Sequence, residues 1–249
     1  MKDIALLVSS GGHTPTRQIL INDFRAFVPP TFDVKTHLSD PERKAVRAIG
    51  CLFDPVDDAL MAALPSLEIV ASFGVGYDHV DAQAAAKRGI MVTHTPDVLD
   101  DEVADTAIGL LINTVRKLPE AERYLRAGRW ETEGSFPLTP LTLRERTVGI
   151  FGMGRIGRAI ARRLDGFGVS IAYHNRAKVD GSPYRYCGSL VELAQSVDTL
   201  INVVPALPST ANAVNADIFA ALGPRGVFIN VGRGTTVVEA DLAQALQSG

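Results

Sequence analysis

The chain has 249 residues, a hydrophobic share of 46% and a formal net charge of −3, which is the profile of a globular protein with one large domain or two small ones. Its Lys and Arg residues are scattered rather than gathered in a basic stripe, which argues against nucleic acid as a partner. Cys51 and Cys187 lie far apart and no Cys/His cluster has zinc spacing, so we predict neither a disulfide scaffold nor a metal site. The apolar stretch 4–8 is too short for a signal peptide or a membrane span, so we expect a cytoplasmic protein that does not bind membranes.

Short β-rich runs alternate with helical patterns from one end of the chain to the other, which indicates parallel sheets with helices on both faces. The predicted fold class is therefore α/β, with doubly wound parallel sheets. In the first part of the chain we predict strands at 4–8, 32–36, 48–53, 67–73 and 90–93, and helices at 57–63 and 80–87.

The alternation changes at Thr95-Pro96, because a proline disfavours helix at the residue before it. Acidic residues follow at 100–102, where a helix start favours negative charge, and the helix predicted at 102–118 is longer than its neighbours. We therefore divide the chain into two domains, 1–98 and 99–249. One stripe of the long helix is apolar, formed by Ala104, Ala107, Ile108, Leu111 and Val115.

The stretch 127–141 is rich in Gly, Pro and aromatic residues, including Trp130, and predicts a loop. On composition alone, a surface loop packed on its own domain is favoured over an arm that contacts a partner subunit. Beyond it we predict strands at 147–151, 169–174, 199–204 and 227–231, and helices at 156–164, 190–195, 216–222 and 239–247.

The strand predicted at 147–151 leads into a G-x-G-x-x-G pattern. In that pattern the first glycine makes a tight turn, the second lets the backbone approach a pyrophosphate, and the third lets the next helix pack closely on the strand. The N–H groups at the start of that helix then face the phosphates. Because strand, turn and helix fall in the required order, we predict a dinucleotide site here. Its predicted contacts are Gly152, Met153, Gly154, Arg155, Ile156 and Gly157.

The residues after the second strand of this half bear on the choice between NAD and NADP. An NAD site usually places Asp or Glu about 20 residues after the glycines. Here Asn175 and Arg176 stand in that region, with Lys178 nearby. A carboxylate would repel a 2′-phosphate, whereas a guanidinium binds one through charge-assisted hydrogen bonds. We therefore predict NADP(H) as the preferred cofactor, with NAD(H) as the alternative.

The chain resembles the D-isomer-specific 2-hydroxyacid dehydrogenase family through four segments that occur in the family's order. They are 71–81, 95–105, the glycine pattern at 147–161 and the Phe-Ile-Asn-Val-Gly-Arg-Gly run at 228–234. The resemblance covers essentially the whole chain, and the Asn-Arg pair is similar to that of the NADP-using hydroxypyruvate/glyoxylate reductases.

The resemblance implies a flavodoxin-like substrate lobe, a Rossmann lobe and a cleft between them. It assigns the substrate carboxylate to the backbone of Val75 and Gly76, where a glycine turn exposes consecutive N–H groups. It makes Arg233 the catalytic arginine, because this residue follows the strand at 227–231, at the end where parallel sheets bind ligands. Candidates for substrate selectivity are Leu52, Phe53 and Tyr77. The further cofactor contacts that it implies are Val204, Pro205, Thr210, Val231, Gly232 and Arg233.

The resemblance also bears on partners. Trp130 and its loop are similar to the family's dimerisation arm, which changes the preferred interpretation of 127–141 from a surface loop to a partner contact. We therefore expect a homodimer formed through the Rossmann lobe and this arm.

The family mechanism needs a general acid, a His that protonates the carbonyl oxygen and whose pKa a nearby Glu raises. The resemblance places both residues beyond Gly249, so we expect a truncated dehydrogenase whose Rossmann lobe is incomplete at its C-terminal end. The five histidines present are poor substitutes, and His13 and His94 are the best placed of them.

Two hypotheses follow. The first is an NADPH-dependent oxidoreductase that reduces a small 2-oxo acid of the hydroxypyruvate or glyoxylate type to a D-2-hydroxy acid. The second is a non-catalytic dinucleotide-binding or redox-sensing module without the general acid. Turnover of NADPH separates them. The identity of the 2-oxo acid stays open, because a few loop residues set selectivity in such sites.

Overall fold

The computed structural model of the chain describes residues 2–11 and 14–248. It forms two compact units, Met1–Val98 and Leu99–Gly249. Both contain a five-stranded sheet in which every strand pair is parallel, so the predicted α/β fold class is confirmed.

In the N-terminal unit the sheet has the order β2-β1-β3-β4-β5, the flavodoxin-like arrangement. A buried cluster that includes Leu7, Ile49, Met61 and Val70 forms the core of this unit. The strands are β1 (Ala5–Val8), β2 (Arg25–Phe27), β3 (Val46–Cys51), β4 (Ile69–Ser72) and β5 (Met91–Thr93). The helices are α1 (Thr14–Asp23), α2 (Val34–His37), α3 (Asp40–Ala45), α4 (Asp58–Ala62) and α5 (Ala82–Lys87).

The strand predicted at 32–36 is wrong. Asp33 caps the start of α2 instead, because its carboxylate accepts a hydrogen bond from the Thr36 N–H at 3.3 Å. The second strand of the sheet lies earlier in the chain, where Arg25–Phe27 pairs with β1. A local side-chain cap therefore overrides the β-rich composition of this segment.

In the C-terminal unit the sheet has the order β10-β9-β6-β7-β8, the Rossmann order of the first five strands seen from the opposite edge. The strands are β6 (Thr147–Phe151), β7 (Ser170–His174), β8 (Arg185–Cys187), β9 (Thr199–Asn202) and β10 (Val227–Asn230). The helices are α6 (Asp100–Arg116), α7 (Leu118–Arg126), α8 (Arg129–Glu133), α9 (Arg155–Asp165), α10 (Leu190–Gln195), α11 (Ala216–Leu222) and α12 (Glu239–Ser248), with a short 3₁₀ helix at Gly234–Thr236.

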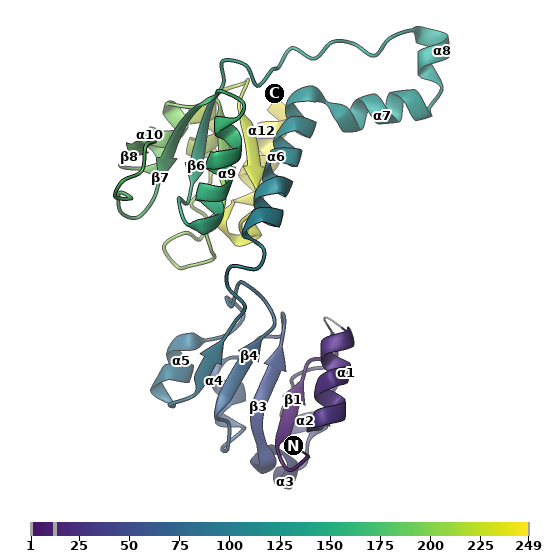
Figure 1. The fold of residues 1–249 in the computed structure, drawn as a ribbon, viewed down its shortest axis with the longest axis vertical. Helices are drawn as coiled ribbons and strands as arrows, with labels where there is room; N and C mark the ends of the chain where they lie inside the picture. Colours follow the sequence, from purple (N-terminus) through teal and green to yellow (C-terminus); the bar gives the residue numbers. More distant parts are fainter. Residues whose placement is uncertain (1, 12–13, 249) are drawn as a thin grey trace. The chain divides into compact units, whose positions relative to one another are not determined.

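Helices cover both faces of this second sheet, as Figure 1 shows for α6 and α9 on one face and α10 on the other. The predicted stripe of α6 is confirmed, since all five of its residues are buried against β6 and α9. Leu193 and Ile218 help to fill the opposite face. Two packed faces fix the sheet in place, so the loops at its strand ends rest on a rigid support.

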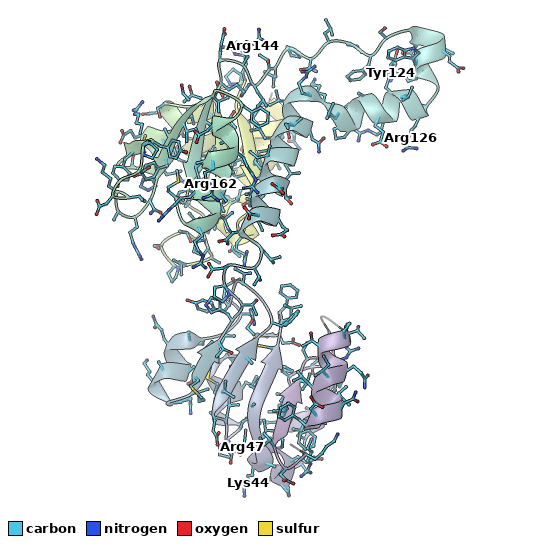
Figure 2. The ribbon with its side chains drawn as sticks, in the orientation of Figure 1. Lys44, Arg47, Tyr124, Arg126, Arg144 and Arg162 are labelled. Atoms are coloured by element: carbon cyan, nitrogen blue, oxygen red, sulfur yellow. The ribbon has the colours of Figure 1, made fainter. Side chains whose placement is uncertain are left out.

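Residues 118–138 form an arm that extends from the rest of the C-terminal unit (Figure 1), and the chain returns to the unit at Thr139, whose hydroxyl donates to the Val115 carbonyl at 2.8 Å. The loop predicted at 127–141 is partly wrong, because α8 lies within it. Tyr124, labelled on α7 in Figure 2, donates a hydrogen bond to the Gly134 carbonyl at 2.8 Å and packs edge-on against Phe136. None of the described helices combines the length and apolarity needed to cross a bilayer.

Candidate functional site

The carboxyl ends of four strands meet along one edge of the C-terminal sheet. Phe151 at the end of β6 is in register with His174 of β7 and with Asn202 of β9, and Asn202 is in register with Asn230 of β10. Loops that follow parallel strands leave a sheet at the same edge, where open α/β sheets bind ligands. Those loops carry the predicted cofactor residues, at 152–157, 175–176, 204–210 and 231–233.

The three glycines of the turn each have a distinct spatial reason. Gly152 has a φ of 107°, which disfavours any other residue, and a Cβ there would lie 2.9 Å from a methyl carbon of Val204. A Cβ on Gly157 would lie 2.1 Å from the Gly152 carbonyl oxygen, so only glycine lets α9 pack this closely on the turn. A Cβ on Gly154 would meet nothing within 4 Å, so open space lies in front of its backbone.

Helix α9 begins directly after this turn. Gly154 is its N-cap residue and has no side chain to cap the helix, so the Ile156 and Gly157 N–H groups of the first turn have no N-cap side-chain acceptor. The Met153 side chain is buried in the core, so only its backbone faces the loop edge. Ile156 also packs against that core, and Arg155 lies 3.5 Å from the Asp100 carboxylate on α6. The turn therefore presents backbone N–H groups to a ligand, as a pyrophosphate requires.

Asn175 and Arg176 directly follow β7. The Asn175 carbonyl accepts a hydrogen bond from the Tyr186 hydroxyl at 3.3 Å, which fixes the backbone at the strand end. Arg176 is exposed, and within the described residues it pairs with no carboxylate. This cation fits the 2′-phosphate of NADP(H), because the N–H donors of its guanidinium are available to bind an anion.

Val204 packs between the glycine turn and the loop that carries Arg233. A Cβ on Gly232 would lie 2.7 Å from the Val204 carbonyl oxygen, a backbone approach that only glycine permits. Next to Val204, the Thr210 hydroxyl donates to the Pro205 carbonyl at 2.6 Å and accepts from the Leu207 N–H at 2.9 Å. The Thr210 side chain thus closes the 205–210 loop.

A polar network holds the backbone of Arg233. The Arg233 carbonyl accepts from the Thr236 hydroxyl at 2.6 Å and from the Asn230 amide at 3.3 Å. The Asn202 amide in turn donates to the Thr236 hydroxyl at 2.7 Å and to Asn230 at 3.1 Å, while the Gly232 N–H donates to Asn230 at 3.0 Å. Asn202 and Thr236 are fully buried, so the half-buried Arg233 emerges from a loop whose backbone is fixed by satisfied buried groups.

The sequence reasoning missed this network, although a signal for it exists. Asn202 follows the apolar pair Leu200-Ile201 in β9, and Asn230 follows the apolar run 227–229 in β10. A polar residue in register with another polar residue on the neighbouring strand indicates a hydrogen bond between them. Thr236 lies in an irregular segment, and no periodicity predicts that it reaches Asn202.

The predicted substrate residues of the N-terminal unit gather at the ends of β3 and β4. Ser72 is in register with Cys51, and a Cβ on Gly74 would lie 3.6 Å from the Leu52 side chain, so Leu52 flanks the turn at 74–76. Within the described part of the chain, the N–H groups of Val75 and Gly76 donate no hydrogen bond. Two successive N–H groups beside an apolar side chain suit a small carboxylate with a short tail.

The histidines of the described residues all make hydrogen bonds within the fold. His13 lies outside those residues. Their contacts are His37 with Thr31, His79 with Ser72, His94 with Val75 and His174 with Cys187. No group of three or more His, Cys, Asp or Glu side chains in the described residues is arranged to hold a metal ion.

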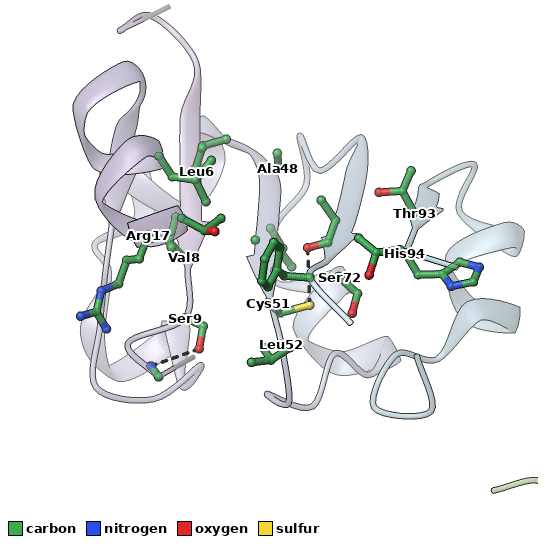
Figure 3. A pocket seen from close by; sticks show the side chains of 18 of the residues that line it. Leu6, Val8, Ser9, Arg17, Ala48, Cys51, Leu52, Ser72, Thr93 and His94 are labelled. Carbon is green, nitrogen blue, oxygen red and sulfur yellow. Dashed lines mark hydrogen bonds between the residues drawn. The ribbon is translucent and has the colours of Figure 1, made fainter. Parts of the chain in front are cut away.

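A cavity of about 410 Å³ lies along one face of the N-terminal sheet (Figure 3). Leu6, Ala48 and Ala71 line it from three strands, and Arg17 of α1 lines it as well. Burial raises the pKa of the Cys51 thiol in its wall to about 12, and the Asp54 carboxylate adds to the shift. Cys51 therefore stays a protonated thiol at neutral pH and is not an activated nucleophile.

Comparison with known proteins agrees with this geometry. Residues 108–249 match the family described as D-isomer specific 2-hydroxyacid dehydrogenase, NAD binding domain. A hydroxyphenylpyruvate reductase of Plectranthus scutellarioides is 41% identical over 100% of this chain and 79% of its own length. A glyoxylate/hydroxypyruvate reductase A of Arabidopsis thaliana is 42% identical over 86% of this chain and 68% of its own.

Among solved structures, an NADPH-dependent glyoxylate/hydroxypyruvate reductase of Sinorhizobium meliloti in complex with NADP and malonate is similar at a TM-score of 0.92. It is 54% identical, and the match covers 99% of this chain and 76% of that one. The chain is thus shorter than these relatives, and what it shares with them includes both units.

Proposed function

The chain belongs to the D-isomer specific 2-hydroxyacid dehydrogenase family, and on that premise we propose that it reduces a small 2-oxo acid with NADPH. The substrate is of the hydroxypyruvate or glyoxylate type, and the product is the D-2-hydroxy acid. The proposal rests on one observation. The carboxyl ends of β6, β7, β9 and β10 lie together around Val204, and the loop after β10 holds Arg233 in a fixed position. Because its relatives are named reductases, a non-catalytic dinucleotide-binding module is the less supported alternative.

The cofactor would bind along the loops of the C-terminal unit. When bound, NADPH supplies the hydride for the carbonyl carbon. Gly152 and Gly154 let the backbone approach the pyrophosphate, and the first turn of α9 donates N–H groups to it. Arg176 binds the 2′-phosphate, with the neutral Asn175 beside it, so NADP(H) is preferred over NAD(H).

Arg233 would bind the 2-oxo acid. Its guanidinium holds the carboxylate and polarises the carbonyl, so the negative charge that develops on the carbonyl oxygen meets a fixed cation. The network of Asn202, Asn230 and Thr236 keeps the Arg233 backbone from moving as that charge develops. The nicotinamide ring would lie on a wall formed by Val204, Pro205, Val231, Gly232 and the loop that Thr210 closes.

On the N-terminal unit, Val75 and Gly76 would donate their N–H groups to the substrate carboxylate, with Leu52 against the substrate's carbon chain. Reduction also delivers a proton to the carbonyl oxygen. The four histidines of the described residues hold hydrogen bonds in the fold, so we assign the proton donor to none of them.

The test follows the consumption of NADPH by the unsubstituted chain with hydroxypyruvate, glyoxylate and pyruvate, alongside NADPH binding in the same preparation. The proposal expects turnover with hydroxypyruvate or glyoxylate and formation of the D-isomer. Binding of NADPH without turnover of any of the three acids would contradict the catalytic proposal and favour the non-catalytic alternative.

We further propose that the arm at 118–138 contacts a second copy of the chain. Leu125, Trp130 and Leu138 on the arm are 60%, 52% and 95% exposed, a larger apolar exposure than a free surface segment favours. The double variant with Trp130→Glu and Leu138→Glu is expected to be a monomer by light scattering. Leu246→Glu, at an exposed leucine of α12, is the control and should leave the mass unchanged. A parent that is already monomeric would contradict the proposal.

A further inference from the structure

We propose that His94 is a positioning residue that aims the Val75 and Gly76 N–H groups at the substrate carboxylate. This inference rests on the proposed function, because it takes those two N–H groups as the carboxylate donors.

Two neighbouring carbonyls of the turn are held by one short segment after β5. The His94 Nδ1 lies 2.9 Å from the Val75 carbonyl oxygen, and the Thr95 N–H donates to the Gly74 carbonyl at 3.0 Å. A carbonyl oxygen only accepts, so Nδ1 of His94 carries the proton and donates it. The segment 94–95 therefore fixes two consecutive peptide planes of the turn.

Fixing a carbonyl also fixes the N–H on the other side of its peptide plane. A trans peptide unit is planar, and its C=O and N–H point in opposite directions. The Val75 carbonyl shares its plane with the Gly76 N–H, and the Gly74 carbonyl shares its plane with the Val75 N–H. Because both carbonyls point toward 94–95, both N–H groups point away from it, and neither donates within the described part of the chain.

The His94 ring is itself held in place. It packs against the Tyr77 ring at a centroid distance of 4.9 Å with an interplanar angle of 52°. At the far end of the turn, the His79 Nε2 lies 3.3 Å from the Ser72 hydroxyl, which ties residue 79 back to the end of β4. The turn is thus fastened at both ends, and among the described residues only the His94 bond acts on the plane that carries the Gly76 N–H.

No helix start takes over this role. β4 ends at Ser72 and α5 begins only at Ala82, where the Asp81 carboxylate caps the helix by accepting from the Ala84 N–H at 2.9 Å. The direction of the N–H groups in the turn must therefore come from side-chain and backbone bonds made by other segments, and His94 supplies the side-chain bond.

Two variants separate the donor of His94 from its ring. His94→Asn keeps an N–H donor at the same branch position and loses the ring, whereas His94→Phe keeps a ring against Tyr77 and loses the donor. His37→Phe is the matched control, since His37 bonds Thr31 elsewhere in the same unit. The probe is oxalate, a non-reducible analogue of glyoxylate, titrated calorimetrically into the full chain saturated with NADP⁺.

We expect His94→Phe to weaken oxalate binding about tenfold, the loss of one well-placed hydrogen bond. His94→Asn should recover most of that affinity, His37→Phe should match the parent, and the affinity for NADPH should stay the same in all three. In spectra of the amide groups, oxalate should shift the Val75 and Gly76 signals of the parent and shift them less in His94→Phe. In turnover, His94→Phe should raise KM for the 2-oxo acid more than it lowers kcat.

The outcomes distinguish this inference from the proposed function. A parent that binds NADPH but not oxalate would overturn the proposed substrate site and this role together. A parent that binds oxalate, with His94→Phe equal to it, would overturn only the positioning role. Equal losses in His94→Asn and His94→Phe would also overturn it, since the hydrogen bond would then not be the cause.

Discussion

The two units share one architecture and prepare an anion site in different ways. In the C-terminal unit β6 ends at Phe151 and α9 begins at Arg155, so the helix start itself directs the N–H groups of the glycine turn. In the N-terminal unit β4 ends at Ser72 and α5 begins at Ala82, so the turn between them is oriented by bonds from His94, Thr95 and His79. In both units a parallel sheet thus provides the edge at which the anion site forms. The number of residues between the strand and the next helix decides whether the helix start or hydrogen bonds from other segments direct the N–H donors.

This difference predicts different sensitivities. The turn at 152–157 depends on the absence of side-chain atoms, so the addition of a single carbon should disrupt its packing or its binding of the cofactor. The turn at 74–76 depends on hydrogen bonds, so removing a donor should weaken it by a moderate amount.

The largest effect is expected from Gly157→Ala. Its Cβ would lie 2.1 Å from the Gly152 carbonyl oxygen, so α9 must move off the turn. We expect a loss of about 3 kcal/mol of folding stability together with NADPH binding, measured by urea denaturation and by cofactor titration.

Two other glycines are the controls for this variant. A Cβ on Gly154 meets nothing within 4 Å, so Gly154→Ala should fold like the parent and lose NADPH affinity by more than about tenfold, because the methyl occupies the approach of the pyrophosphate. Gly109→Ala, inside α6 with equally open space, should keep both properties. Normal stability in Gly157→Ala would contradict the close packing of α9 on the turn.

Arg233→Lys is expected to lower kcat/KM for the 2-oxo acid about 100-fold, because a point charge replaces a planar fork of donors aimed at the developing oxyanion. The affinity for NADPH should change little, since the backbone network around residue 233 is retained. The control is Arg144→Lys, at an exposed arginine before β6, which should behave like the parent. A kcat/KM within twofold of the parent in Arg233→Lys would remove this residue from the reaction.

Arg176→Glu is expected to weaken NADPH about 30-fold and NADH by no more than about twofold, because the new carboxylate repels only the 2′-phosphate. Fluorescence titration with both cofactors measures the ratio. Arg185→Glu, at an exposed arginine of β8, tests for a general effect of charge. Equal losses for the two cofactors in Arg176→Glu would be incompatible with a phosphate contact at this residue.

Thr236→Val should have the smallest effect of the set. The variant keeps the shape of a fully buried residue and removes the hydroxyl that binds the Arg233 carbonyl. We expect kcat/KM to fall about fivefold and the folding stability to fall by about 1 kcal/mol, with NADPH affinity unchanged. Thr114→Val, on the exposed side of α6, is the control. If Thr236→Val has the same kcat/KM as the parent, the network does not support the function of Arg233.

Much of the fold follows from the sequence because buried parallel strands are short continuous apolar runs. The stripe of α6 and the strand, turn and helix around Gly152 are of this kind, and both appear in the structure where they were predicted. The ligand edge follows as well, since parallel strands must end together.

The remainder depends on contacts that no periodicity encodes. Asp33 caps a helix where a strand was predicted, which moves the second strand to Arg25–Phe27. Asn202 reaches Thr236 across 34 residues, and His94 reaches Val75 across 19. Each contact joins two segments that are far apart in the sequence, and the local pattern of neither segment predicts the contact. Only the tertiary structure therefore shows which side chains hold the site loops.

The most direct test of the cofactor site is a titration of NADPH into the isotope-labelled, unsubstituted chain, followed through its backbone amide signals. The account predicts the largest shifts at Gly152, Gly154 and the first turn of α9, with further shifts at Arg176 and Gly232. Binding of NADPH that leaves those signals in place and shifts amides elsewhere in the chain would contradict it.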